Sequence, residues 1–284
     1  PEKAVRWYRR HGYDFLVLSD HNHLTLLEHR PGRRRFRRPI MIPGEEISAN
    51  IKQGKVPIHI GGIGITRVVE PIDTGDIVST IQANVNAIVD AGGIASINHP
   101  NLKWAFNHEA ISQITGASLL EVFNGHHGAN DEGGLGRFSS EEIWDGVLSA
   151  KRAIFGVATD DSHHYHDFHP NMANPGRGWL MVRSSEFSGE AIVNAIAEGE
   201  FYASTGIVLE TVERSPELIS LRIEQEQDLV YRTTFTGNEG AVLAEMAGLT
   251  PSYKPRGDEG YVRATARSSA HGQRAWVQPV FLTD

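Results

Sequence analysis

The sequence contains no cysteine. This absence excludes a disulfide framework, a cysteine nucleophile, a thiolate zinc site and an iron–sulfur cluster. It leaves the compartment open, because a chain without thiols is compatible with reducing and oxidising surroundings alike. Any metal site in this chain must therefore use imidazole, carboxylate or other oxygen ligands.

Long apolar runs and an excess of positive charge are also missing. No run reaches the ~18 apolar residues that a membrane-spanning helix needs, and the first ten residues are typical of a helix rather than a signal peptide. We therefore expect a soluble protein, cytoplasmic or exported, without a membrane partner. The 27 Lys and Arg against 35 Asp and Glu give a formal net charge of −8. This balance argues against a nucleic-acid-binding surface over the whole protein and leaves nucleic acid only as a substrate.

The composition is that of an ordinary folded chain. Its 284 residues are 40% hydrophobic and 22% charged, so a full hydrophobic core is expected. The length fits one domain of barrel size, or a medium domain with a small one attached. Nothing in the composition indicates an oligomeric state.

Histidine is unusually frequent and unevenly placed. Of the 14 histidines, all but His11 and His271 lie between His21 and His169. The first two-thirds of the chain is therefore the place to search for chemistry.

Predicted strands and helices alternate over the first two hundred residues. Apolar spacing and capping patterns predict helices over 2–10, 77–90, 139–150 and 189–198. Short apolar runs predict strands over 14–19, 40–42, 56–60, 94–97, 119–123, 154–159 and 179–182. Such alternation indicates an α/β domain built on parallel strands.

The pattern changes near Thr205. Beyond this point alternating apolar residues, as over 219–223 and 275–282, predict short antiparallel strands and no helix. We therefore place a boundary near Gly206, with an α/β domain over 1–206 and a small β-sandwich over 207–284.

Metal-binding side chains follow four of the predicted strands: His21, Glu46, His99, and Asp161 with His163. In a parallel barrel the carboxyl ends of all strands open on one face, so these groups should converge. Imidazole and carboxylate ligands suit Zn²⁺, Mn²⁺ or Fe, and a carboxylate such as Glu46 can bridge two ions. One histidine at a strand end is more often a satisfied buried polar group, but the repetition at four strand ends favours a common site.

Four segments resemble successive motifs of the polymerase and histidinol phosphatase (PHP) superfamily: Gly12 to His21, Ile42 to Glu46, Asn98 to Pro100 and Thr159 to His163. The resemblance covers residues 1 to 207 in order and approximate spacing. It implies a distorted (β/α)7 TIM-like barrel with two or three divalent ions, Zn, Mn or Fe, at its carboxyl-terminal rim.

The resemblance also implies ligand roles. Glu46 would bridge two ions, with Asp161 on the first and His59 and His99 on the second. His21 and His163 would bind a third ion.

The remaining acidic groups and His59 have alternative interpretations. Asp20 and Asp160 would orient a ligand imidazole or a water, although Asp20 could cap a strand and Asp160 could be solvated. His59 lies within a predicted strand, so a packed core histidine is an equal alternative.

The family's first motif, a His-x-His followed by an acidic residue, would precede the opening helix and does not occur in this sequence. Without it the first ion would keep only Glu46 and Asp161 as protein ligands. We therefore expect either a truncated chain or a first metal site that lacks part of its ligands. His21-x-His23 could substitute only superficially, because His21 already matches the second motif.

The chain's end resembles a PHP subgroup. Phe201 to Gly206 and the stretch from Tyr261 to Phe281 are similar to the carbaryl-hydrolase-like (CehA/McbA) group, whose members append a small β domain. Ordinary sandwich strands are the alternative interpretation of the same residues.

Three features between and beyond the motifs suggest an anionic substrate. Six arginines between Arg30 and Arg38 could attract anions to the site, although a solvated loop is the more common meaning of a charge run. Arg177 could clamp a phosphate or carboxylate with two hydrogen bonds, or be an ordinary surface residue. His126 could contact substrate as a rim group.

The sequence therefore predicts a metal-dependent hydrolase, in first place a phosphoesterase that uses a metal-bridging hydroxide on a small phosphate ester. Glu46 and Asp20 are the expected catalytic residues. Hydrolysis of a carboxyl or carbamate ester on the same centre is one alternative, and a non-catalytic barrel is another.

Overall fold

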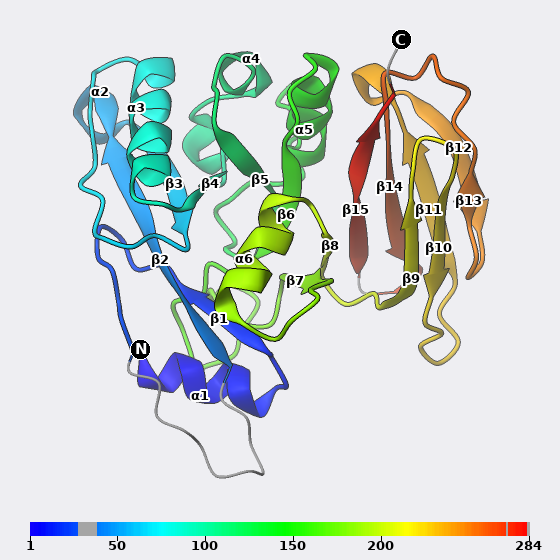
Figure 1. Ribbon diagram of the computed structural model, residues 1–284, viewed down its shortest axis with the longest axis horizontal. Coiled ribbons are helices and arrows are strands. Elements are labelled where there is room, and N and C mark those ends of the chain that lie inside the picture. Colours follow the sequence, from blue (N-terminus) through cyan, green and yellow to red (C-terminus); the bar gives the residue numbers. More distant parts are fainter. Residues whose placement is uncertain (28–38, 271, 283–284) are drawn as a thin grey trace.

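The structure is a computed structural model that describes residues 1–27, 39–270 and 272–282 (Figure 1). The arginine-rich run from Arg30 to Arg38 lies outside the described residues. Within them, no helix is long and apolar enough to cross a lipid bilayer.

The first half of the chain forms a curled six-stranded sheet in a mixed α/β arrangement. Its strands follow one another in chain order: β1 (Phe15–Leu18), β2 (Ile40–Asn50), β3 (Val56–Ile63), β4 (Ile94–Ile97), β5 (Ala117–Asn124) and β6 (Phe155–Thr159). β1 and β6 are the two ends of this order. The described residues therefore form a half-barrel, and a closed (β/α)7 barrel is not observed.

One strand runs against the others. β1 pairs parallel with β2, and β4, β5 and β6 pair parallel in turn. β3 is antiparallel to both β2 and β4, so the expectation of uniformly parallel strands is wrong at β3. The reason is the link before it: the one-turn helix α2 (Ile51–Gly54) is far too short for the crossover that a parallel neighbour requires.

β2 is longer than the sequence indicated, because it exchanges partners along its length. Its first residues, up to Pro43, pair with β1, and its residues from Gly44 onward pair with β3. A Cβ atom at Gly44 would lie 2.3 Å from Cγ1 of Val17 and 3.1 Å from the carbonyl oxygen of Gly62. Only glycine allows this close approach at the exchange point. Consequently Glu46 lies within a strand, not after one.

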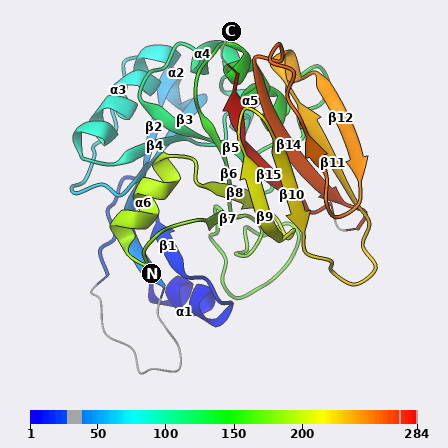
Figure 2. The ribbon, with the colours of Figure 1, turned by 45° about the vertical axis from the view of Figure 1, so that its right-hand side comes forward.

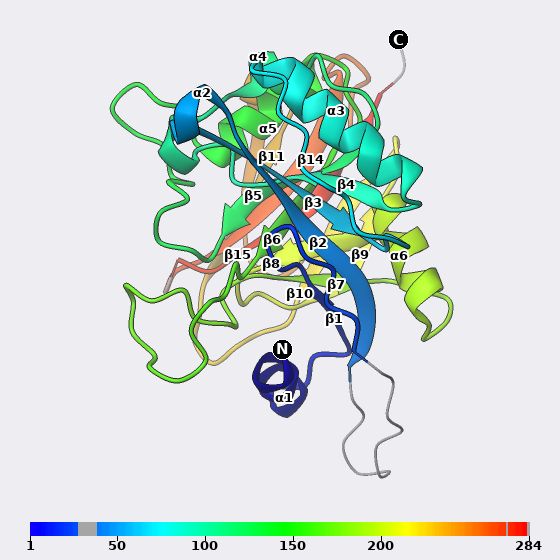
Figure 3. The same ribbon diagram turned by 90° about the vertical axis from the view of Figure 1, so that its left-hand side faces the viewer.

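Three helices cover one face of the sheet: α3 (Ile77–Asp90), α4 (His108–Ile111) and α5 (Ser140–Ser149) (Figures 1 and 3). The α3 and α5 helices begin at side-chain caps, Asp76 for α3 and a capping box of Ser139 and Glu142 for α5. Their apolar residues, such as Ile81 and Trp144, pack on the sheet in the largest core cluster.

The inner face of the half-barrel holds a smaller core. Ile42, Leu119 and Val157 pack there with Ile192 and Ile196 of α6 (Gly189–Ala197). The first helix, α1 (Glu2–Arg10), lies near β1 (Figure 3). The sheet is thus covered on both faces.

The rest of the chain adds two antiparallel sheets beside the half-barrel (Figure 2). One has the order β12-β11-β14-β15-β8-β7 and the other β13-β10-β9. Their apolar residues form a separate core cluster. The strands are β7 (Trp179–Val182), β8 (Phe201–Ser204), β9 (Leu209–Arg214), β10 (Ile219–Ile223), β11 (Tyr231–Thr236), β12 (Val242–Ala247), β13 (Ser252–Tyr253), β14 (Tyr261–Ser268) and β15 (Arg274–Phe281).

Strand pairing crosses the expected boundary. β7 and β8 precede Gly206 but pair with each other and, through β8, with β15. The chain's two halves therefore share backbone hydrogen bonds, and a domain boundary near residue 206 stays a prediction.

Buried polar contacts also join the halves. The Arg263 side chain, 3% exposed, donates hydrogen bonds of 2.6 and 2.7 Å to the two carboxylate oxygens of Asp145 on α5. The Tyr261 hydroxyl donates to the same carboxylate at 2.7 Å. These contacts fix α5, and with it the half-barrel, against β14.

Candidate functional site

Three neighbouring strands bring His21, Glu46 and His59 together. One donor atom from each of the three side chains lies within 4.8 Å of the others. His21 follows β1 and forms an isolated parallel bridge with Glu46 of β2. On β3, His59 faces Ser48, two residues along β2 from Glu46. The pairing register of β1, β2 and β3 therefore builds the group.

His99 joins the group from the end of β4. The Glu46 Oε2 atom lies 3.0 Å from Nδ1 of His21 and 3.7 Å from Nδ1 of His59. The Oε1 atom of the same carboxylate lies 3.6 Å from Nε2 of His99. The nitrogens of His59 and His99 that face the carboxylate are 2.8 Å apart. Three imidazoles thus surround one buried carboxylate, whose two oxygens face different histidines.

The cluster sets the charges of its members. Burial raises the pKa of Glu46, but the hydrogen bond with His21 and the charges of His99 and His59 outweigh it and lower the pKa to about 2. Burial lowers the pKa of His59 to about 4. Near neutral pH Glu46 is therefore an anion and His59 is neutral, which are the protonation states of metal ligands.

A second carboxylate, which sequence reasoning missed, holds His99. Glu121 of β5 is 3% exposed, and its Oε2 atom accepts the His99 backbone N–H at 2.7 Å and lies 3.0 Å from its Nδ1. The Thr159 hydroxyl donates to Oε1 at 2.7 Å. Burial lowers the pKa of His99, but the charge and hydrogen bond of Glu121 together with the charges of Glu46 and Asp161 outweigh burial and raise it to about 9. The sequence signal was one charged residue within the apolar run of β5.

An amide on each side completes the surroundings of the cluster. The Asn98 side chain donates to Oε1 of Glu46 at 2.8 Å. The Asn124 side chain donates to Glu121 at 3.0 Å and to Asp161 at 3.2 Å. Both were missed as site residues, because their chemistry is visible only once β4, β5 and β6 are side by side.

Asp161 and His163 lie on the same rim but less tightly. The Oδ1 atom of Asp161 lies 3.6 Å from Nδ1 of His163. The rings of His163 and His21 have centroids 6.3 Å apart, and the His163 side chain is about half exposed. The structure therefore places His21, Glu46, His99, Asp161 and His163 at one rim, although Glu46 lies within β2. Their individual roles as ligands stay predictions.

The backbone is strained at two of these positions. His99 has a φ of 24° and Asp161 a φ of 45°. Residues other than glycine rarely adopt such values, and they persist where surrounding contacts determine them. With this backbone conformation His99, after β4, faces Glu46, and Asp161, after β6, lines a cavity beside the cluster.

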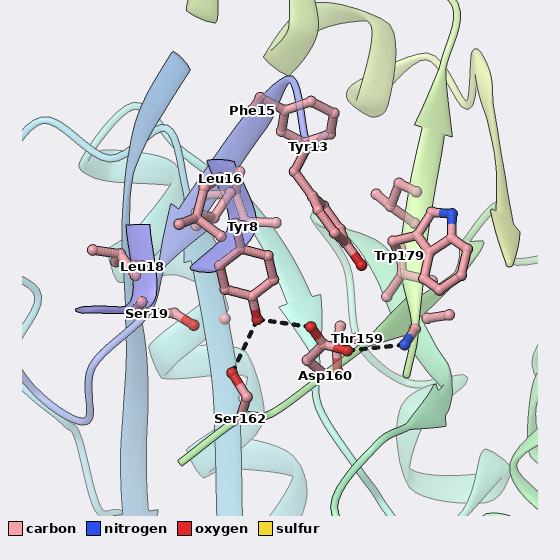
Figure 4. A pocket seen from close by; sticks show the side chains of 18 of the residues that line it. Tyr8, Tyr13, Phe15, Leu16, Leu18, Ser19, Thr159, Asp160, Ser162 and Trp179 are labelled. Atoms are coloured by element: carbon pink, nitrogen blue, oxygen red, sulfur yellow. Dashed lines mark hydrogen bonds between the residues drawn. The ribbon is translucent and has the colours of Figure 1, made fainter. Parts of the chain in front are cut away.

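The two neighbouring aspartates differ from each other. Asp20 is exposed, accepts a hydrogen bond from the Thr25 hydroxyl and uses its backbone carbonyl to accept the Glu46 N–H at 3.2 Å. Asp160 is buried and accepts the Tyr8 hydroxyl at 2.7 Å and the backbone N–H groups of residues 176, 177 and 178 at 2.8, 2.6 and 3.0 Å (Figure 4). Asp160 thus anchors α1 and the 176–178 loop.

The two expected substrate-binding residues lie near this rim. Arg177 donates from Nη1 to the Gly125 carbonyl at 2.7 Å and from Nη2 to the carbonyls of His169 and Pro170 at 3.1 and 3.3 Å. Its guanidinium therefore ties loops together. The ring of His126 lies 5.9 Å from that of His163. Contact of either residue with substrate stays a prediction.

A cavity of about 1130 Å³ opens beside the cluster. Its lining includes His21, Glu46, Asp161 and His163 at one end and the apolar residues of β1 and β7 further away. The cluster is thus accessible to a molecule of substantial size.

Comparison with known proteins gives little further information. No protein-family model matches the sequence, and no curated protein matches it. Among solved structures, the chain is similar to a two-domain protein from Bacteroides vulgatus containing a predicted PHP-like metal-dependent phosphoesterase. The identity is 14%, the match covers 97% of this chain and 89% of that chain, and the TM-score is 0.47.

Proposed function

We propose that this protein is a metal-dependent hydrolase whose centre is the Glu46 cluster. The observation that carries the proposal is the convergence of three imidazoles, from His21, His59 and His99, on one buried carboxylate. One donor atom from each of His21, Glu46 and His59 lies within 4.8 Å of the others, and Nε2 of His99 lies 3.6 Å from the same carboxylate. A divalent cation could replace the contacts among these donors and bind to them directly.

The donor set fits a divalent ion of the Zn, Mn or Fe type. The ligand atoms that the cluster offers are imidazole nitrogens and carboxylate oxygens, which these ions accept. The His99 ring contacts the Glu121 carboxylate through Nδ1, so its other nitrogen, Nε2, faces Glu46. This arrangement of carboxylate, histidine and metal position is common in protein metal sites, because the carboxylate fixes the ring and raises its basicity.

The geometry supports Glu46 as a bridging residue. Its Oε2 atom faces His21 and His59, whereas Oε1 faces His99 and accepts from Asn98. Two ions could therefore share the carboxylate, with Asp161 on the first and His59 and His99 on the second, and His163 with His21 could hold a third. Two or three ions and these assignments are part of the proposal.

Divalent ions held here would act as Lewis acids toward a phosphoryl or acyl oxygen and would activate water for attack. The protein's own contribution is to hold the ligands. Glu121 orients His99, the Asn98 amide orients Glu46, and the Asp20 carbonyl fixes the backbone of Glu46. Asp20 would also position a water through its exposed carboxylate, and His126 and Arg177 would contact an anionic substrate.

We infer that the substrate is a phosphate ester, because a site rich in imidazole and cations neutralises the charge of a phosphoryl group. A carboxyl or carbamate ester, as membership of the carbaryl-hydrolase-like group would favour, needs the same residues. Hydrolysis assays with both kinds of ester distinguish the two substrate classes.

The experiment is a paired metal and activity measurement. Purified protein is stripped with chelator, reloaded with Zn²⁺ or Mn²⁺, analysed by mass spectrometry for bound metal, and assayed on p-nitrophenyl phosphate, bis-p-nitrophenyl phosphate and p-nitrophenyl acetate. The Glu46→Gln variant should bind less metal, and its turnover should fall at least 100-fold, since removal of a bridging carboxylate removes both charge and ligand. Glu45→Gln is the matched control, because Glu45 is equally buried but only bonds the Val69 N–H at 3.0 Å.

Each outcome decides between hypotheses. Metal with hydrolysis of the phosphate substrates supports the proposal, and hydrolysis of only the acetate supports the carboxyl ester alternative. Bound metal with no activity on any substrate indicates a non-catalytic metal-binding protein. Wild-type metal content and turnover in Glu46→Gln would refute the role of this cluster.

A further inference from the structure

One buried amide contacts three parts of the candidate site. Asn124 is the last residue of β5 and is 4% exposed. Its side chain forms hydrogen bonds with Glu121 at 3.0 Å, with Asp161 at 3.2 Å and with the backbone N–H of His126 at 2.7 Å. Glu121 orients His99. Asp161 is an expected ligand of the first ion, and His126 is an expected substrate contact.

These contacts determine which way the amide points. Its Oδ1 atom accepts the His126 N–H, and its Nδ2 atom faces two carboxylate oxygens, Oε2 of Glu121 and Oδ2 of Asp161. The reverse orientation would place the NH₂ group against an N–H donor and the amide oxygen against two carboxylates, so all three hydrogen bonds would be lost. The cluster therefore faces the amide nitrogen, which donates hydrogen bonds and does not bind a cation.

The two hydrogens of the amide match the two carboxylates. A side-chain NH₂ group has two N–H donors, so one is available for Glu121 and one for Asp161. A third atom, Nδ1 of His99, lies 3.1 Å from the amide nitrogen. This Nδ1 atom also lies 3.0 Å from the Glu121 carboxylate, so it carries a proton and is not an acceptor for Asn124. Both donors of Asn124 are thus used, one by each acidic side chain.

The two carboxylates that share the amide belong to different ion positions. Glu121 lies on β5 and acts through His99, which is an expected ligand of the second ion. Asp161 follows β6 and is an expected ligand of the first ion. Two negative charges held close together repel each other, and donors between them offset that repulsion. Asn124 supplies these donors and so links the ligands of the two positions.

The backbone of Asn124 is itself held in place. Its N–H donates to Oδ2 of Asp131 at 2.7 Å, and Oδ1 of Asp131 accepts the Ser140 hydroxyl at 3.0 Å. The backbone carbonyl of Asp131 accepts the Ser140 N–H at 2.8 Å. Ser140 begins α5, so the link between β5 and α5 is tied to the end of β5. A group that orients metal ligands needs this kind of support.

We propose that Asn124 is a positioning residue that holds Asp161 and the Glu121–His99 pair in one arrangement, and thereby couples the two ion positions that share Glu46. This inference rests on the proposed function, because it assigns Asn124 a role toward ions that the Glu46 cluster would bind.

The chain offers a matched control for the loss of a buried amide. Asn84 of α3 is 0% exposed and also forms three hydrogen bonds: it accepts the Ile72 N–H at 2.9 Å and donates to the carbonyls of Ile72 at 2.8 Å and Thr80 at 2.7 Å. None of these partners belongs to the cluster. Asn84→Ala therefore removes as many hydrogen bonds as Asn124→Ala without changing the site.

The test measures zinc affinity in competition with a chromogenic chelator. Asn124→Ala should weaken zinc binding about 10-fold or more, which is the effect expected when a group that orients metal ligands is lost. Asn84→Ala should stay within 2-fold of the wild type. Both variants should have a lower free energy of unfolding in urea, since each loses buried hydrogen bonds. Asn124→Ser keeps one hydroxyl donor, so it should show a smaller loss of affinity, and it decides the question if Asn124→Ala does not fold.

A double-mutant cycle tests the route of the effect. In an Asp161→Ala background, Asn124→Ala should weaken zinc binding less than it does in the wild type, because one of the carboxylates through which Asn124 acts is gone. An equal loss in both backgrounds would overturn the proposal.

The remaining outcomes separate this inference from the proposed function. If the wild type binds zinc and Asn124→Ala binds it equally well, or if Asn84→Ala is weakened as much, Asn124 is not a positioning residue and the proposed function stands. If the wild type binds no zinc, the proposed function is wrong and the role of Asn124 is refuted with it.

Discussion

Glu121 offers a specific test of how the cluster is held. The substitution Glu121→Gln keeps the size of the side chain but removes its charge. The amide oxygen can still accept from Nδ1 of His99, and the Thr159 hydroxyl can reverse to accept from the amide nitrogen, since a hydroxyl both donates and accepts. The geometry of β5 should therefore survive while the negative charge near His99 is lost.

The expected magnitude follows from the contacts. Glu121 makes charge-assisted contacts with the backbone N–H and Nδ1 of His99 at 2.7 and 3.0 Å. Loss of a carboxylate that supports a metal-bound histidine typically weakens metal affinity 10- to 100-fold, which is about 1.4 to 2.7 kcal/mol. We expect this loss for Zn²⁺ in competition with a chromogenic chelator.

Glu45→Gln is the control for burial alone. Glu45 is also buried but its carboxylate accepts from the backbone of Val69 rather than from a histidine. Its substitution should change zinc affinity less than 3-fold. If Glu121→Gln binds zinc within 2-fold of the wild type, or if both variants are weakened equally, the role of Glu121 in positioning His99 is wrong.

Two further predictions concern stability. Asp145→Leu should lower the free energy of unfolding in urea by about 3–5 kcal/mol, because it removes the carboxylate that accepts two hydrogen bonds from the buried Arg263 and leaves only the longer carboxylate contact, with Glu141. Breaking the exposed pair of Arg232 and Glu245 should cost less than about 1 kcal/mol, and equal costs would contradict the buried network. Burial raises the pKa of Glu259, but hydrogen bonds from neighbouring N–H and hydroxyl groups lower it to about 2. The contribution of Glu259 to the free energy of unfolding is therefore complete above the unfolded pKa of about 4.3 and is lost as pH falls toward 2. Glu259→Gln should therefore destabilise the protein at pH 7 and match the wild type near pH 2, and a difference that is independent of pH would refute this.

Local signals in the sequence predicted much of the fold. The capping box at Ser139 and the apolar period of the 77–90 segment predicted α5 and α3 correctly, because both depend on residues close in sequence. The direction of β3 was not predictable from its own composition. It depends on the length of the link at α2, whose backbone includes Lys52 and Gln53 at φ values of 52° and 59°.

The site was predictable where it depended on strand ends and not where it depended on register. His21, His99 and Asp161 follow strands, so their convergence could be expected. Glu121 contacts His99 only because β4 and β5 are neighbours, and a lone glutamate in an apolar strand does not show which strand it faces. The resemblance to PHP motifs predicted the place of His59, which from its own surroundings could equally be a core residue.

Binding of a divalent cation by Glu46, His59 and His99 can be seen in crystals of the protein soaked with ZnCl₂ and measured on both sides of the zinc absorption edge. We expect an anomalous peak about 2.0–2.2 Å from a carboxylate oxygen of Glu46 and from the facing nitrogens of His59 and His99. Saturating zinc that gives no peak at these side chains, or peaks only at other histidines, would contradict it.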